Sequence, residues 1–269
     1  MKSYIQTIAL LLLAFTTIPT NAQGLEKIVV EKYYISTDKD IAKTGGVLPK
    51  GSVTYRIYVD MLPGYRFQAA FGIPGHELKI ATTTTFFNNE DYGSIIPTVI
   101  PYRNIGNNTV MLDSWLTAGA ACEGNWGVLK SDDDENNTVV NKDNLLQNEN
   151  PAAGIPLKAR DGFYNGVAPR ITFFGIDSLA KQLFGNTNTS TAPTVFSTEN
   201  GSWATLEGTN GPTPENRVLI AQLTTNGILS FELNIQIGRP GEGVERYVAK
   251  NPSGDEIVLK SLIYNSSLN

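Results

Sequence analysis

The chain has 269 residues, a formal net charge of −5 and one cysteine, Cys122. A single cysteine excludes an intrachain disulfide and a cysteine-rich zinc site. The acidic balance disfavours nucleic acid and anionic membrane surfaces as partners, and no run of Lys or Arg reverses it locally. A chain of this length can bury a core that is stable without covalent staples.

The first 22 residues have the pattern of a cleaved signal peptide. Lys2 supplies a positive start, residues 5–15 form an apolar run, and Ala22 ends the segment on a small residue. The apolar run is too short to cross the hydrocarbon core of a bilayer, and no second run follows. We therefore expect an exported protein, periplasmic or extracellular, that starts near Gln23 and is not inserted in a membrane.

Alternation of apolar and polar residues dominates the rest of the chain and predicts strands. The first clear strand covers residues 53–61, with Val53, Tyr55, Ile57 and Val59 toward a core and Thr54, Arg56, Tyr58 and Asp60 toward solvent. Residues 78–87 carry four threonines, whose β-branched side chains suit a strand. Shorter strands are expected at residues 109–117, 170–174, 194–197 and 202–206.

The segment at residues 217–237 has the strongest hairpin pattern. Two alternating runs flank Asn226-Gly227, a dipeptide that favours tight hairpin turns. In the second run Leu229, Phe231, Leu233, Ile235 and Ile237 are expected to face inward, and Ser230, Glu232, Asn234 and Gln236 outward. Residues 247–264 predict one more hairpin near the end of the chain.

Long loops rich in Asn, Gly and Asp separate the strands, and one short helix is predicted at residues 177–184. Such loops require a rigid scaffold, which two packed antiparallel sheets supply. We therefore expect an all-β fold, an antiparallel β-sandwich or a jelly roll. Residues 23–269 would form a single domain, in which residues 244–269 add a C-terminal hairpin.

Several segments resemble a family of uncharacterised secreted proteins from Bacteroidota. The longest is TGGVLPKGSVTYRIYVDM at residues 44–61, and others lie at residues 86–91, 112–115, 120–122, 127–131, 216–220 and 231–238. Longer proteins similar to these continue into a C-terminal sorting domain of the type IX secretion pathway. This chain ends at Asn269 without room for such a domain, so attachment to the outer surface by that route is not expected. The resemblance implies export but assigns no catalytic residue.

An acidic loop at residues 132–143 is the strongest candidate for a metal site. The oxygens of Asp132, Asp134, Asn136 and Asp143 stand at spacings that resemble an imperfect twelve-residue calcium loop. The pattern predicts bound Ca²⁺ as the only cofactor, and the alternative is a solvated acidic loop. No other cofactor pattern is visible, because the glycines at residues 238–243 lack the residues of a phosphate-binding loop.

Aromatic residues indicate where a ligand could bind. Trp126 lies in a loop and Tyr92 follows an acidic cluster, so both could stack on a sugar ring. Trp115 and Trp203 fall in predicted strands and are expected in the core.

The residues that nucleophilic catalysis requires are scarce. Cys122 lies among small apolar residues and is expected to be buried and unreactive. His76 is the only histidine and is expected to be exposed in a turn. Paired carboxylates of a glycoside hydrolase form no recognisable motif. No catalytic residue is therefore predicted.

The sequence predicts a secreted, non-catalytic binding or adhesion protein whose ligand is a glycan or another component of a cell surface or matrix. Two alternatives remain open. One is a structural protein that assembles through its sheets, with residues 82–85 at an exposed edge. The other is a glycoside-acting enzyme.

Overall fold

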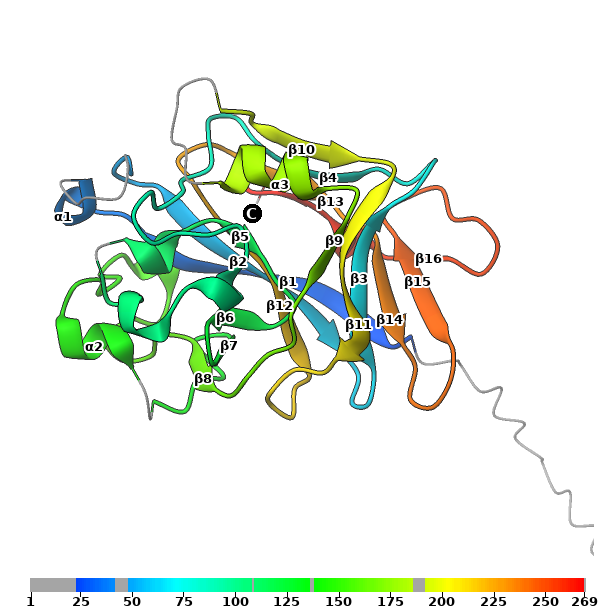
Figure 1. Cartoon of the computed structure of the whole chain (residues 1–269), viewed down its shortest axis with the longest axis horizontal. Helices are drawn as coiled ribbons and strands as arrows, with labels where there is room; N and C mark the ends of the chain where they lie inside the picture. The colour runs from blue at the N-terminus through cyan, green and yellow to red at the C-terminus, as the bar shows by residue number, and fades with distance from the viewer. Residues whose placement is uncertain (1–22, 42–47, 108, 136–137, 186–191, 269) are drawn as a thin grey trace, which may run out of the picture.

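The computed structural model describes residues 23–41, 48–107, 109–135, 138–185 and 192–268. The segment predicted as a signal peptide, residues 1–22, lies outside this part. Strands dominate, as predicted (Figure 1). They are β1 (Leu25–Ile35), β2 (Val53–Met61), β3 (Arg66–Gly72), β4 (Leu78–Thr82), β5 (Trp115–Leu116), β6 (Ala120–Cys122), β7 (Asn125–Gly127), β8 (Phe163–Asn165), β9 (Thr172–Phe174), β10 (Val195–Thr198), β11 (Gly201–Thr209), β12 (Arg217–Thr225), β13 (Leu229–Glu232), β14 (Ile235–Gly238), β15 (Val244–Val248), β16 (Ile257–Val258) and β17 (Ile263–Asn265).

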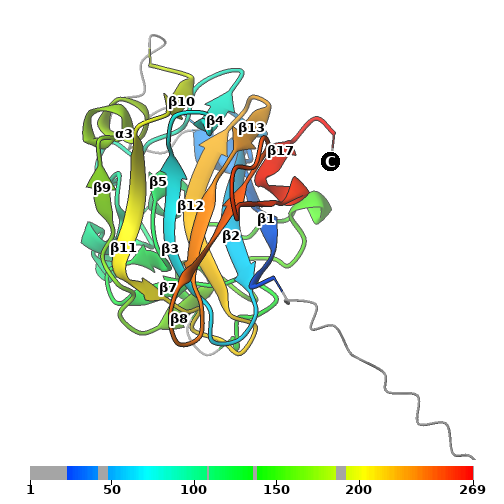
Figure 2. The same ribbon diagram turned by 90° about the vertical axis from the view of Figure 1, so that its right-hand side faces the viewer.

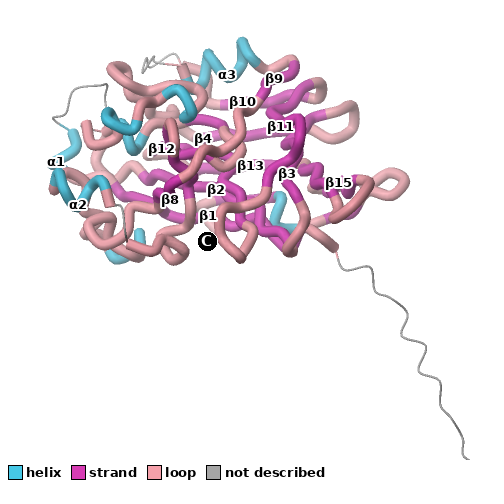
Figure 3. Tube along the Cα trace, turned by 60° about the horizontal axis from the view of Figure 1, so that its bottom comes forward, coloured by secondary structure: helices cyan, strands magenta, loops and turns pink. Residues whose placement is uncertain are grey.

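Helices are few and short, and most of them lie away from the main sheets (Figure 3). The α-helices are α1 (Asp38–Ile41), α2 (Val139–Asp143) and α3 (Asp177–Phe184), and the 3₁₀ turns are η1 (Pro97–Val99), η2 (Tyr102–Asn104), η3 (Val110–Leu112), η4 (Pro151–Ala153) and η5 (Lys260–Leu262). The predicted helix at residues 177–184 is confirmed as α3, which buries Ala180, Leu183 and Phe184 against the core. None of the described helices has the length and apolarity needed to cross a membrane.

Four sheets build the body of the molecule. Their strand orders are β1-β2-β12-β5, β10-β4-β13-β17, β16-β15-β14-β3-β11-β9 and β6-β7-β8. All pairings are antiparallel except that of β15 with β16. Figure 2 shows the long strands of the sheets running side by side across the molecule. The expected antiparallel all-β fold of β-sandwich type is therefore confirmed.

Both faces of the sheet β1-β2-β12-β5 are covered. The expected core side packs into a large cluster with residues such as Ile57, Trp203 and Ile235. The opposite side packs into a second cluster, which the long segment between β4 and β9 supplies. Thr54, Arg56, Tyr58 and Asp60 are all at most 4% exposed, so the predicted solvated face of β2 is wrong. The loops between β4 and β9 therefore cover this face of the sheet, which was expected to contact solvent.

The predicted hairpin at residues 217–237 is also wrong. β12 pairs with β2 and β5, whereas β13 pairs with β4 and β17, so the turn at Asn226-Gly227 carries the chain from one sheet to another. The residues of the turn cannot distinguish a hairpin within one sheet from a passage between two sheets, because the chain reverses its direction in both cases.

The second run of that segment changes sheet again at Asn234. This side chain, expected to face solvent, is 1% exposed. Its amide nitrogen donates to the carbonyls of Phe71, His76 and Glu77, and its oxygen accepts the backbone N–H of Ala249. These bonds replace strand pairing at the corner between β13 and β14.

Two further predictions about strands are corrected. Residues 247–264 do not form a hairpin, because β15 and β16 pair in parallel and β17 joins β13 in another sheet. The Thr-rich segment is not a free edge, because β4 lies between β10 and β13. The hydroxyls of Thr82 and Thr84 bond to the hydroxyl of Thr225.

Candidate functional site

A buried ionic cluster fastens the loop layer to the sheet β1-β2-β12-β5. Its centre is Arg56 on β2, which has no solvent exposure and whose guanidinium carbon lies 3.6 Å from the centroid of the Tyr33 ring. Arg56 Nε donates to Gln222 Oε1 at 2.9 Å, and Nη1 donates to the carbonyl of Gly162 at 3.0 Å. Gln222 in turn donates to the carbonyls of Met111 and Asp113. The cluster therefore joins β2, β12 and two loop segments.

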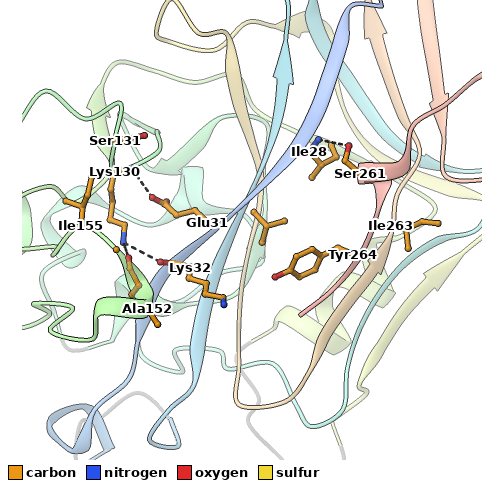
Figure 4. A pocket seen from close by; sticks show the side chains of 13 residues that line it. Ile28, Glu31, Lys32, Lys130, Ser131, Ala152, Ile155, Ser261, Ile263 and Tyr264 are labelled. Carbon is orange, nitrogen blue, oxygen red and sulfur yellow. Dashed lines mark hydrogen bonds between the residues drawn. The ribbon is translucent and has the colours of Figure 1, made fainter. Parts of the chain in front are cut away.

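Lys130 and Glu31 continue this cluster to the surface. The Lys130 ammonium donates to the carbonyls of Lys32, Tyr33 and Ala153 (Figure 4). Burial lowers the pKa of Lys130 to about 8. Glu31 Oε1 accepts the backbone N–H of Lys130, while Oε2 is buried without a partner among the described residues. Burial raises the pKa of Glu31, against the opposite effect of the cations of Lys130 and Arg56.

An open groove of about 680 Å³ lies over this point, along the outer edge of β1. Turn η5 covers one end of the edge, where Ile28 N–H donates to Ser261 Oγ. Turn η4 covers the other end, where the Lys130 ammonium donates both to the Lys32 carbonyl and to the carbonyl of Ala153 in η4. Between the two covers lies Val30. Ile155 and Tyr264 line the two sides of the groove (Figure 4). The backbone groups of Ile28 and Lys32 point away from β2, so by the alternation of a strand those of Val30 also point into the groove.

A second groove contains Trp126, one of the two aromatic residues predicted to bind ligand. It has a volume of about 630 Å³ and is lined by residues from four segments: Arg66, Trp126, Val167, Ala168, Pro169, Arg170, Glu207, Gly208, Thr209, Asn210 and Gly211. The Trp126 side chain is half-buried. Gly119, at φ +105°, and Gly166, at φ +143°, approach the indole so closely that an added methyl group would lie 2.3 Å and 3.1 Å from it. These glycines hold the ring in place.

The Trp126 groove continues into a smaller hollow on each side. One, of about 260 Å³, shares Val167, Ala168 and Arg170 with it and reaches Cys122 and Glu123. The other, of about 320 Å³, shares Arg66 and Glu207 with it and reaches Arg239. We call the three together the Trp126 cleft. Figures 1 and 2 place β7, which carries Trp126, near the end of β11 that carries Glu207.

Two arginines of the Trp126 cleft have exposed side chains without an ion pair. Within the described ranges, neither Arg66 nor Arg170 takes part in a salt bridge. Arg239 is paired, because its Nε lies 3.1 Å from Glu245 Oε1. Among the described residues, Glu207 is the one carboxylate that lines the central groove. This lining combines an aromatic ring, two guanidiniums without an ion pair, one carboxylate, the two polar residues Thr209 and Asn210, and three apolar residues at 167–169.

Tyr92, the other predicted aromatic, lies elsewhere. Its side chain is exposed, and it does not line the Trp126 cleft. Its backbone N–H and that of Asp91 both donate to Asn89 Oδ1 in an Asx turn. The structure therefore separates the two aromatic candidates.

The acidic loop predicted to bind calcium is held by protein groups. Asp132 Oδ2 lies 2.9 Å from Arg217 Nη1, and Asp133 accepts the backbone N–H groups of Glu135 and Gly162. Asp134 has an interaction partner. Asn136 and the side chain of Asp143 lie outside the described residues. In the part of the chain that is described, no group of three or more acidic, His or Cys side chains is arranged to hold a metal.

Asp133 also lies beside Asp161, a second buried carboxyl group. Asp161 accepts the backbone N–H groups of Val139 and Phe163, and its own carbonyl accepts the Tyr33 hydroxyl at 2.6 Å. Burial, followed by the charge of Asp133, raises the pKa of Asp161 to about 7. The two aspartates tie the acidic loop to the segment before β8.

Cys122 and His76, the residues considered for nucleophilic catalysis, are both buried. Cys122 is buried as expected, and burial raises the pKa of its thiol to about 12, which disfavours the nucleophilic thiolate. His76 was expected in an exposed turn, but it is 6% exposed and its Nε2 lies 3.0 Å from Glu256 Oε2. The turn itself is present, since Ile73 and His76 form a bridge. The loop that ends at Glu256 covers it.

Sequence reasoning identified Trp126 but missed Arg66, Arg170 and Glu207 beside it. They lie between 44 and 81 positions from Trp126 in the sequence, and no local pattern connects them. Comparison of the chain with models of known families, with curated proteins and with solved structures found no match.

Proposed function

We propose that the protein binds a glycan of a cell surface or matrix without transforming it, and that the Trp126 cleft is the binding site. The observation that carries the proposal is a half-buried tryptophan in a groove that also holds two arginines without an ion pair, one glutamate and the polar side chains of Thr209 and Asn210. Sugar rings present apolar faces that stack on aromatic rings and hydroxyl groups that hydrogen-bond to charged and amide side chains. The cleft offers both kinds of partner.

The shape of the site also favours an extended ligand. Three adjoining hollows follow one another, and they share lining residues at each junction. A chain of sugars could occupy successive hollows, with Trp126 beneath the central unit. The paired glycines at the indole fix the ring before binding, which lowers the entropic cost of association.

Binding of a glycan array by the wild type and by Trp126→Ala tests this proposal. We expect the substitution to weaken binding of the recognised glycan by at least tenfold, because stacking on an indole contributes about 1–3 kcal/mol. Tyr92→Ala is the matched control, since Tyr92 is an exposed aromatic outside the cleft. Loss of binding in the Tyr92 variant but not in the Trp126 variant would move the site to the other aromatic candidate.

A second candidate function is assembly with other copies through the edge of β1. The observation that favours it is the gap at Val30 between the covers η4 and η5, where by strand alternation the backbone N–H and C=O groups face an open groove. An exposed edge of this kind can pair with an added strand.

Sedimentation of Val30→Pro tests the assembly. Proline removes the N–H that faces the groove but is tolerated on an edge strand, so the fold should persist while association is lost. Val30→Ala retains the N–H and should associate like the wild type. A wild-type protein that stays monomeric at tens of micromolar contradicts this second function.

A further inference from the structure

We infer that the glycan bound by the Trp126 cleft is acidic, and that carboxylates of its uronic acid units pair with Arg66 and Arg170. This inference rests on the proposed function and adds the class of ligand to it. Its basis is the placement of the two unpaired guanidiniums. Arg170 lies where the central groove meets one flanking hollow, and Arg66 lies where it meets the other.

Several arginines of this chain, Arg66 and Arg170 among them, form no ion pair within the described ranges. Acidic side chains outnumber basic ones by 26 to 21, so partners for arginine are abundant. Arg160, Arg217 and Arg239 each pair with a carboxylate. Arg66 and Arg170 instead line the central groove of the Trp126 cleft, where Glu207 is the one carboxylate among the described residues. A ligand that brings its own carboxylates would supply the missing partners.

The geometry of the groups favours a carboxylate. The planar guanidinium presents parallel N–H donors that match the two oxygens of a carboxylate, and such pairs bind more strongly than neutral hydrogen bonds. Glu207, which lines the central groove and the same flanking hollow as Arg66, repels ligands with a dense negative charge. It can instead accept hydrogen bonds from sugar hydroxyl groups. A uronic acid polymer has one carboxylate on each sugar and keeps free hydroxyl groups, so it satisfies both requirements.

Calorimetric titration with oligogalacturonate tests the inference, with the same oligomer after chemical reduction of its carboxyl groups as the neutral match. We expect the acidic oligomer to bind at least tenfold more tightly than the reduced one. Arg66→Gln and Arg170→Gln should each weaken binding of the acidic oligomer by about tenfold and leave binding of the reduced oligomer unchanged. Arg103→Gln is the control, because Arg103 is exposed on η2 and lies outside the cleft.

The possible outcomes separate this inference from the function on which it rests. Equal affinity for both oligomers, with binding sensitive to Trp126→Ala but not to the arginine substitutions, overturns the acidic ligand and leaves glycan binding in place. Tighter binding of a sulfated oligomer than of oligogalacturonate also overturns the assignment to carboxylates. A wild-type protein that binds no glycan of the array overturns both.

Discussion

The guanidinium carbon of Arg56 lies over the ring of Tyr33, 3.6 Å from its centroid, with both side chains fully buried. The two residues come from neighbouring strands, β2 and β1, and face the layer of loops. The Tyr33 ring and the oxygens that accept hydrogen bonds from Arg56 stabilise its charge, which allows this cation to be buried. This contact explains why the sheet has a second buried face.

We expect Arg56→Ala to lower the free energy of unfolding by about 3–5 kcal/mol. The substitution leaves Gln222 Oε1 and the Gly162 carbonyl without their donor and removes a cation beside Glu31. Urea denaturation measures the change. Arg246→Ala is the control, because Arg246 lies on β15 with an exposed hydrogen bond to Gln236, and it should cost less than about 1 kcal/mol. Similar values for the two variants would contradict a structural role for the cluster.

Stability should fall as the pH rises from about 4 to 8. Burial raises the pKa of Asp161 to about 7 and that of Asp113 to about 8. Between the ordinary pKa of aspartate and these values the folded state binds more protons than the unfolded state, so a rise in pH favours unfolding. The stabilising contribution is complete below about pH 4 and is lost above the raised pKa of each group.

Asp133→Asn tests the origin of this pH dependence. The substitution removes the negative charge beside Asp161 and should lower the pKa of Asp161, which makes the fall in stability between pH 4 and 7 shallower. The contribution of Asp113 should persist, because its raised pKa comes from burial. Chemical denaturation at several pH values measures both slopes. Identical slopes in the wild type and the variant would show that Asp133 does not act on Asp161.

We expect Gly119→Ala to displace the Trp126 ring and to weaken ligand binding. The added methyl group would lie 2.3 Å from the indole, at a backbone φ of +105° that disfavours alanine. Gly75→Ala is a matched control: it has φ +90° but no atom within 4 Å of the added methyl group, and Gly75 lies outside the Trp126 cleft. Both variants should lose about 1–2 kcal/mol of stability from the backbone, and only Gly119→Ala should also change tryptophan fluorescence and glycan binding.

The calcium prediction gives a separate experiment. A site at the acidic loop should bind one Ca²⁺ at millimolar concentration, and Asp132→Asn with Asp134→Asn should abolish that binding. Because Asp132 is already paired with Arg217, the ion must compete with a guanidinium, and Arg217→Gln should increase the affinity. Equilibrium dialysis measures the bound ion. A wild-type protein that retains no calcium at millimolar concentration contradicts the site, and loss of the ion should leave the sheets intact.

Local patterns predicted several strands and the short helix, but they missed β1 and β3 and did not give the partners of the strands. The predicted strand at residues 109–117 is mostly the turn η3, followed by the two residues of β5. Residues 217–225 and 229–232 form strands as expected, yet the chain between them passes from one sheet to another. Asn234 has the polarity of an outward position, but four hydrogen bonds bury it at a corner. The same alternation is compatible with several pairings, and only contacts distant in sequence select among them.

The candidate site shows the same division. Trp126 was identified because an aromatic residue in a polar loop is a local property. Arg66, Arg170 and Glu207 lack such a property, and each resembles an ordinary surface charge until the fold brings them to one groove. Arg56 alternates like a solvent-facing residue, although a layer of loops covers it completely.

The amino-acid sequence by itself determined the all-β class of this protein, the buried positions of Trp115 and Trp203, and the short helix α3. These features follow from side-chain periodicity and composition, which act over a few residues. The tertiary structure decided which strands pair, which charges are buried and which arginines reach the Trp126 cleft. Those outcomes depend on desolvation and packing between segments far apart in the chain, and such energies are absent until the chain has folded.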